Sequence, residues 1–156
     1  MAEQRPTNLA APDDTSRIVA LSGRRIDAEK QHPSRFPFSR VSAVSNEIKM
    51  KLVTEQAETL VCSAACGADL LALEVAQALG IRTRIILPYS RADFRKTSVT
   101  DRPHQDFWGP LFDRVVAEAH KHGDVLELGC RKAEDASFLA TNEAIIDEAQ
   151  NLAEHN

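Results

Sequence analysis

The stretch "LVCSAACGADLLALE" (residues 60–74) decides the fold of this chain. It begins as a short apolar run, breaks at small residues and Gly67, and continues as an apolar helical pattern that opens with Asp69. A change of this kind is typical of a buried strand that leads through a turn into a helix. The turn is either a plain connection between the two elements or the floor of a ligand site.

The same alternation of strand and helix patterns continues on both sides of this unit. We expect strands at residues 17–22, 59–64, 82–89 and 124–129, and helices beginning after Ser39 and covering residues 68–79, 108–119 and 134–153. Ser39 is a candidate cap for the first helix, and Gly80 is expected to end the second. About twenty residues from 90 to 109 are expected to form a functional loop, because long structureless loops are otherwise uncommon. The alternation predicts an α/β Rossmann-like three-layer sandwich with a mainly parallel sheet of about four or five strands.

The composition limits the class of protein. The chain has 156 residues, of which 43% are hydrophobic and 27% charged, as in a soluble globular domain. Residues 1–16 are expected to be a flexible N-terminal tail, and residues 17–156 a single domain that could belong to a longer chain. The sequence has no apolar run of membrane-spanning length and no signal-like segment, so we expect a cytoplasmic protein without a membrane partner. The net charge of −4 argues against nucleic acid as a partner.

The cysteines and glycines exclude several kinds of site. Cys62, Cys66 and Cys130 are an odd number, and the first two are expected to be small buried hydrophobic residues rather than metal ligands. Neither the dinucleotide-binding pattern G-x-G-x-x-G nor the P-loop pattern is present in the sequence. We therefore expect no metal and no cofactor.

Basic residues gather in two stretches of this acidic chain. The first stretch holds Arg24, Arg25, Arg35 and Arg40, and the second holds Arg91, Arg95, Lys96 and Arg102. Loops at residues 23–27, 65–69 and 90–98 are expected to meet at the carboxyl ends of the strands, where helix N-termini favour anions. Backbone N–H groups near Gly23 and Gly67 would hold phosphate there. The sequence thus predicts a site for a small anionic ligand.

Three polar residues in helical patterns have open interpretations. Asp69 either caps its helix or contacts a ligand. Glu74, two turns after Gly67, either faces a ligand sugar, pairs with a loop arginine or is solvated. Asn142 lies inside the apolar stripe of the last helix and is expected to be buried, bonded either to a loop backbone or to a ligand.

The candidate ligand-binding residues lie mainly in the predicted loops. They are Ser22, Gly23, Arg24, Arg25, Asp27, Ala65, Gly67, Asp69, Glu74, Arg91, Arg95, Ser98 and Asn142. Asp69 or Glu74 would accept hydrogen bonds from ribose hydroxyls, as an acidic residue does in other nucleotide-binding folds. The same two carboxylates are the catalytic candidates if the protein is an enzyme, which the sequence leaves open.

Residues 61–88 resemble the central unit of the SLOG superfamily, which includes DprA and the LOG-type phosphoribohydrolases. DprA-like members have a strand followed by a turn with serine, alanine, glycine and aspartate in that order. Ser63, Ala65, Gly67 and Asp69 match these residues, while Ala64 stands where the first glycine would be. The stretches "LSGRRID", "SRFPF" and "FRKTSV" also look like a bacterial SLOG-type family with a G-H-M-I-D-like turn, in which Arg24 replaces the histidine.

This resemblance implies a nucleotide or nucleotide-derived ligand at the carboxyl ends of the strands. LOG enzymes carry P-G-G-x-G-T-x-x-E, and this chain lacks the Pro-Gly-Gly and the threonine, so that Glu74 is the only candidate for that glutamate. We expect a regulatory module that senses the ligand and acts on a second copy of the chain or an appended effector domain. The alternatives are a nucleotide hydrolase that cleaves an N-glycosidic bond and a structural oligomerisation domain.

Overall fold

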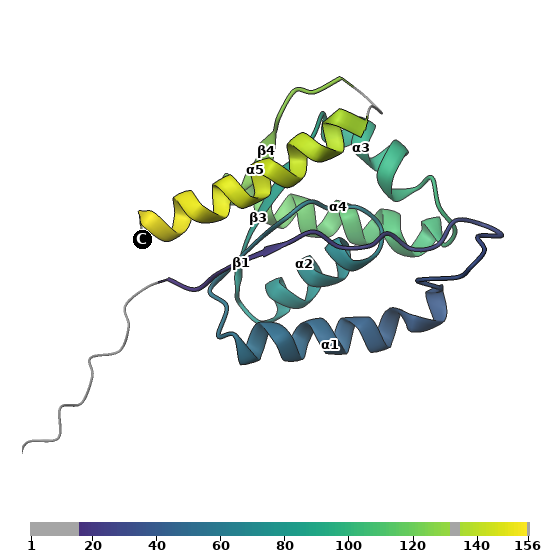
Figure 1. Ribbon diagram of the computed structural model, residues 1–156, viewed down its shortest axis with the longest axis horizontal. Helices are drawn as coiled ribbons and strands as arrows, with labels where there is room; N and C mark the ends of the chain where they lie inside the picture. The colour runs from purple at the N-terminus through teal and green to yellow at the C-terminus, as the bar shows by residue number, and fades with distance from the viewer. Residues whose placement is uncertain (1–15, 132–134, 156) are drawn as a thin grey trace, which may run out of the picture.

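The computed structural model describes residues 16–131 and 135–155, so nearly all of the expected N-terminal tail lies outside the described residues (Figure 1). The four strands β1 (Ile18–Leu21), β2 (Thr59–Cys62), β3 (Arg82–Leu87) and β4 (Val125–Glu127) form one parallel sheet. Their order in the sheet is β1-β2-β3-β4, the same as their order in the chain. The predicted α/β class and parallel sheet are confirmed.

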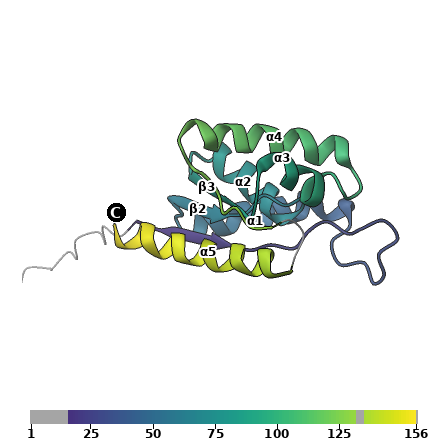
Figure 2. The same ribbon diagram turned by 90° about the horizontal axis from the view of Figure 1, so that it is seen from above.

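The helices form a layer on each face of this sheet, which completes the predicted three-layer sandwich (Figure 2). The helices α1 (Val41–Thr54), α2 (Ala68–Ala78) and α4 (Gln105–Lys121) connect successive strands and pack side by side on one face. Right-handed crossovers between strands that never reverse their order put every connecting helix on the same side. The last helix, α5 (Asp135–Glu154), connects to no later described strand and crosses the opposite face.

The alternation of side chains along the central strands divides the core into two parts. Leu60 of β2 and Ile85 of β3 pack beneath α1, α2 and α4. Val61 and Ile86 point to the other face and pack against Ile145 of α5. Because both faces are covered, the central strands are continuous apolar runs, as the quoted stretch shows. Within the described residues, no helix is both long and apolar enough to cross a bilayer.

Two local predictions are wrong. Residues 90–109 are not a structureless loop, because they contain α3 (Arg91–Phe94), the π-helix η2 (Arg95–Val99) and the start of α4. The sequence of this segment has no helical periodicity of apolar residues, but Phe94 and Val99 are buried in the core and hold its helical turns in place. Ser39 does not cap α1: the 3₁₀ turn η1 (Phe38–Arg40) precedes the helix, and its N-cap residue Arg40 makes no capping side-chain hydrogen bond.

Candidate functional site

The loops that follow β1, β2 and β3 meet at the carboxyl edge of the sheet, as predicted. The Ile26 N–H donates to the Cys66 carbonyl at 2.9 Å, and the Cys66 N–H donates to the Ser98 carbonyl at 3.0 Å. The Arg102 guanidinium donates to the Ile26 carbonyl at 2.8 Å. These bonds join the three loops into one surface.

Gly67 is required where the first loop crosses the start of α2. Its φ is 133°, and a Cβ added there would lie 2.4 Å from the Arg24 carbonyl oxygen and 2.8 Å from the Arg25 Cα. The Ala68 N–H, the first of α2, donates to the Arg24 carbonyl at 3.0 Å. The glycine therefore allows two backbones to pack together, and the first N–H of the helix is already bonded within the protein.

A cavity of about 200 Å³ lies at this edge, and we call it the strand-end cavity. It brings together seven of the candidate residues, from the loops after β1 and β2, from α2, from η2 and from α5. They are Ser22, Gly23, Arg25, Ala65, Asp69, Ser98 and Asn142. The cavity also has five lining residues that sequence reasoning missed: Ser63, Pro88, Phe94, Phe138 and Thr141. Ser63 and Pro88 directly follow β2 and β3, and the predicted strands 59–64 and 82–89 extend past both residues, which hid their position at the strand ends. No local signal marks the other three.

Asp69 is the buried acid of the strand-end cavity. Its residue is 6% exposed, and its carboxylate oxygens accept from the Gly23 N–H at 3.0 Å and the Ala65 N–H at 3.4 Å. Burial raises the pKa of Asp69 to about 7, because these two bonds and the Arg25 charge only partly offset the loss of solvation. The side chain thus orders both loops and titrates near neutral pH, a property common at functional sites. The Gly23 N–H, a candidate phosphate donor in the sequence, donates to Asp69 instead.

Asn142 reaches the cavity from α5, but it is not buried. The Ser22 hydroxyl donates to its Oδ1 at 3.0 Å, which links the end of β1 to α5. The predicted burial is wrong because α5 faces the sheet with the small side chains Ser137 and Thr141, four residues apart, both 4% exposed. Asn142 follows that stripe and lies at its border. Of the large apolar residues expected around it, Ile145 is buried at 2%, whereas Phe138 at 44%, Leu139 at 61% and Ile146 at 53% are exposed.

Arg25 brings a guanidinium to the strand-end cavity. It forms an ion pair with Asp101 and donates to the Cys66 sulfur at 3.4 Å. Burial would lower the pKa of Arg25, but the interactions with Asp101 and Cys66 together outweigh it, so the net pKa is raised. Its Nε is buried without a hydrogen-bond partner among the described residues. Cys66 is itself buried, as the sequence predicts, and burial raises the pKa of its thiol.

Several candidate residues form ion pairs outside this cavity. Glu74 accepts from Arg114 of α4 at 2.7 Å, so an arginine partner is present, although on a helix rather than a loop. Arg91 pairs with Glu127 at 3.3 Å, and Arg95 pairs with Asp113 at 2.8 Å. The structure therefore does not bring Glu74, Arg91 or Arg95 to the strand-end cavity.

A second hollow, of about 500 Å³, lies beside the first loop, and we call it the arginine hollow. Its charged residues are Arg24, Arg35 and Arg40, and its remaining lining is Ser34, Phe36, Pro37, Val44 and Ala68. All three arginines belong to the early basic stretch of the sequence. The candidates Arg24 and Gly67 thus lie next to the strand-end cavity rather than in it.

Asp27 organises the loop that carries Arg35. Its carboxylate accepts from the Ser34 hydroxyl at 2.7 Å, the Arg35 N–H at 3.0 Å and the Phe36 N–H at 2.9 Å. Desolvation, which would raise the pKa of Asp27, is outweighed by these bonds and by the Arg24 charge, so the net pKa is lowered. The Asp27 carboxylate therefore stabilises the loop through these hydrogen bonds and does not line the strand-end cavity.

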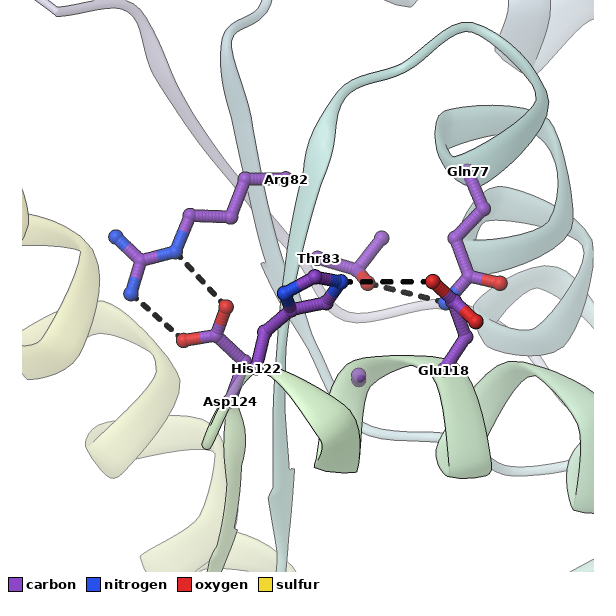
Figure 3. A pocket seen from close by; sticks show the side chains of 7 residues that line it. Gln77, Arg82, Thr83, Glu118, His122 and Asp124 are labelled. Atoms are coloured by element: carbon purple, nitrogen blue, oxygen red, sulfur yellow. Dashed lines mark hydrogen bonds and ion pairs between the residues drawn. The ribbon is translucent and has the colours of Figure 1, made fainter.

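A third hollow, of about 430 Å³, lies at the amino ends of β3 and β4, and we call it the amino-end hollow (Figure 3). Arg82 forms a two-pronged pair with Asp124, with distances of 2.9 and 2.6 Å. The Gln77 amide donates to the Thr83 hydroxyl at 3.2 Å, and His122 lies 3.4 Å from Glu118. The polar groups of this hollow are therefore paired with one another.

No family model matches the chain, and no curated protein matches it. The chemistry of the site must therefore follow from its own residues. The strand-end cavity offers hydroxyls, an amide and a carboxyl beside aromatic rings, and its one guanidinium, that of Arg25, is already paired with Asp101. This lining suits an uncharged polar group with a flat apolar part. The arginine hollow offers positive charge beside an apolar wall.

Proposed function

We propose that the protein is a SLOG-like regulatory module that binds the nucleoside part of a nucleotide-derived ligand in the strand-end cavity. The observation that carries the proposal is the convergence of Ser22, Asp69 and Asn142 on one cavity at the carboxyl edge of the sheet. This edge is where open α/β sheets bind ligands.

The size and lining of the cavity support a nucleoside rather than a whole nucleotide. A volume of about 200 Å³ is smaller than the roughly 300–1,000 Å³ of pockets that enclose a drug-sized ligand. A ribose could donate to the Asp69 carboxylate and replace the bond between Ser22 and Asn142. Phe138, which lines the cavity and is 44% exposed, could stack on a base.

The regulatory part of the proposal rests on α5. This helix contributes Phe138 and Asn142 to the cavity, and it exposes Leu139 and Ile146 on its outer surface. A small movement of α5 on ligand binding would therefore change an apolar surface that a partner chain can contact. A change of mass in solution on addition of ligand would test this step.

A thermal-shift titration with adenosine, guanosine and ADP-ribose tests the binding site. A ligand at a hundred times its dissociation constant stabilises by about 2.7 kcal/mol, which is roughly 5–10 °C for a domain of this size. Asn142→Ala should remove most of the shift, whereas Asn151→Ala, an exposed asparagine farther along α5, should not. The absence of any shift, or an equal shift in both variants, would overturn the proposal.

Hydrolysis of an N-glycosidic bond is the second candidate function, because one specific observation favours it. Asp69 lines the cavity and has a pKa of about 7, which suits a general acid or base at neutral pH. Release of free base from nucleoside monophosphates that stops in Asp69→Asn would support this function. Binding of the nucleotide by the wild type without release of free base would contradict hydrolysis and agree with the regulatory proposal.

A further inference from the structure

The arginines of the arginine hollow differ from most of the other described arginines in their partners. Six described arginines form ion pairs with carboxylates: Arg25, Arg82, Arg84, Arg91, Arg95 and Arg114. Arg102 donates to a backbone carbonyl. Across residues 16–131 and 135–155, the arginines with neither an ion pair nor a side-chain hydrogen bond are Arg17, Arg24, Arg35, Arg40 and Arg131. Of these, Arg24, Arg35 and Arg40 line one hollow. In a chain with 23 acidic and 19 basic residues, this clustering leaves positive charge unmatched at one place.

The nearest acid does not neutralise this charge. Asp27 is close enough for the Arg24 charge to lower its pKa, but its oxygens already accept from Ser34 and from two backbone N–H groups. These bonds hold the segment that carries Arg35 in place. The acid therefore builds the hollow and leaves its guanidiniums available.

The start of α1 adds to the same positive field. The α-helices α2, α3, α4 and α5 each have an aspartate in the first turn, whereas α1 has none and no side-chain cap. Arg40 is its N-cap residue, and Val44, one turn later, lines the hollow. A helix start attracts negative charge, and here no described carboxylate supplies it.

We propose that the arginine hollow binds the pyrophosphate group of a small molecule, either free pyrophosphate or the diphosphate of a nucleotide. Arginine forks match phosphate oxygens and remain charged at every physiological pH. The apolar wall formed by Phe36, Pro37 and Val44 would lie beside whatever the diphosphate carries. The site is distinct from the strand-end cavity, because the two hollows share no lining residue.

Calorimetric titration of the full chain at low ionic strength with pyrophosphate, ADP and adenosine tests this site. The double variant Arg35→Ala/Arg40→Ala should weaken pyrophosphate binding about a hundredfold, since each lost charged hydrogen bond is worth about tenfold. The matched control, Arg114→Ala/Lys121→Ala, removes the same charge from exposed residues of α4 and should bind as the wild type does. Equal affinity for pyrophosphate and ADP would identify the free anion as sufficient, and tighter ADP binding would identify a nucleotide.

Two outcomes would overturn the inference. One is no pyrophosphate binding by the wild type, and the other is an equal loss in the control, which would indicate attraction to charge in general. Circular dichroism would show that the variants are folded. Adenosine binding that depends on Asn142 tests the strand-end cavity separately, so the failure of either proposal is distinguishable from the failure of the other.

Discussion

Two hollows at opposite ends of the same sheet use arginine in different ways. At the amino-end hollow, Arg82 and Arg84 both lie against Asp124, which is 3% exposed, and Arg84 also pairs with Glu148 at 2.8 Å. At the arginine hollow, Arg24, Arg35 and Arg40 have no such partner among the described residues. The first group therefore stabilises the fold, whereas the second remains available for a ligand.

The difference has a source in the fold. β3 and β4 pack against α4, and β3 also packs against α5, where Glu148 lies within ion-pair distance of Arg84. The arginine hollow is built from loops around the start of α1, where the described helix offers no acid in its first turn. Substitutions at the two ends of the sheet should therefore differ in their effects on stability and binding.

The largest effect should come from Gly67→Ala, which would separate the loops at the carboxyl end. Its φ of 133° and the 2.4 Å approach to the Arg24 carbonyl leave no room for a methyl group, so we expect a loss of about 5 kcal/mol in unfolding free energy. Gly80 has a φ of 73°, but a Cβ added there would have no atom within 4 Å, so Gly80→Ala should cost only about 1 kcal/mol. Urea unfolding measures both, and equal losses would contradict this account.

A pH-dependent stability should follow from Asp69. Its pKa is about 7 in the folded protein and near its ordinary 3.8 in the unfolded chain, so between these values the folded state binds the extra proton. The unfolding free energy should fall as the pH rises from about 4 to about 7, by on the order of 4 kcal/mol, and should then level off.

Asp69→Asn should remove this slope because the amide does not ionise. Asp106→Asn, which alters an exposed first-turn aspartate of α4, should keep it. Thermal unfolding from pH 4 to pH 8 makes the comparison. The same pH dependence in the wild type and in Asp69→Asn would contradict the raised pKa of Asp69.

Removal of the acid at the amino-end hollow should cost less but still be clear. Asp124→Ala would leave Arg84, whose side chain is 19% exposed, and Arg82, whose side chain is 47% exposed, without their shared partner. We expect a loss of about 2 kcal/mol, below the value for a fully buried pair because Arg82 is partly solvated. Asp113→Ala, which breaks the exposed pair with Arg95, should cost less than about 1 kcal/mol.

The smallest effect on stability should come from the arginine hollow itself. Arg35→Ala and Arg40→Ala remove no ion pair in the described structure, so each should change the unfolding free energy by less than about 0.5 kcal/mol. Arg84→Ala should be distinctly worse, because that side chain contacts two carboxylates and the Gly123 carbonyl. Comparable losses at Arg35 and Arg84 would remove the distinction between the two regions.

Much of the architecture could be predicted because its signals are local. The apolar run at Leu60, the turn at Gly67 and the apolar face of the following helix are repeated along the chain, and their alternation implies a parallel sheet with right-handed crossovers. The meeting of three loops at one edge follows from the same alternation, since parallel strands end at the same side of a sheet.

The site could be predicted only in part, because long-range contacts decide which side chains share a cavity. The hydroxyl of Ser22 meets Asn142, which is 120 residues away in the chain, and Glu74 is engaged by Arg114 on a neighbouring helix. The segment at residues 90–109 has helical turns because Phe94 and Val99 are buried, and no local periodicity indicates this. These pairings depend on how the layers pack.

The sequence by itself determined the fold class, the order of the strands and helices, and the edge of the sheet at which polar loops gather. These properties follow from the spacing of apolar residues and from the need to bury both faces of a parallel sheet. The packing of the layers places Arg91 and Arg95 in ion pairs elsewhere, while Arg24, Arg35 and Arg40 line one hollow and have no ion-pair partner within the described part of the chain. The physical reason is that the electrostatic role of an arginine depends on the carboxylates near it in space, and its neighbours in the chain do not specify them.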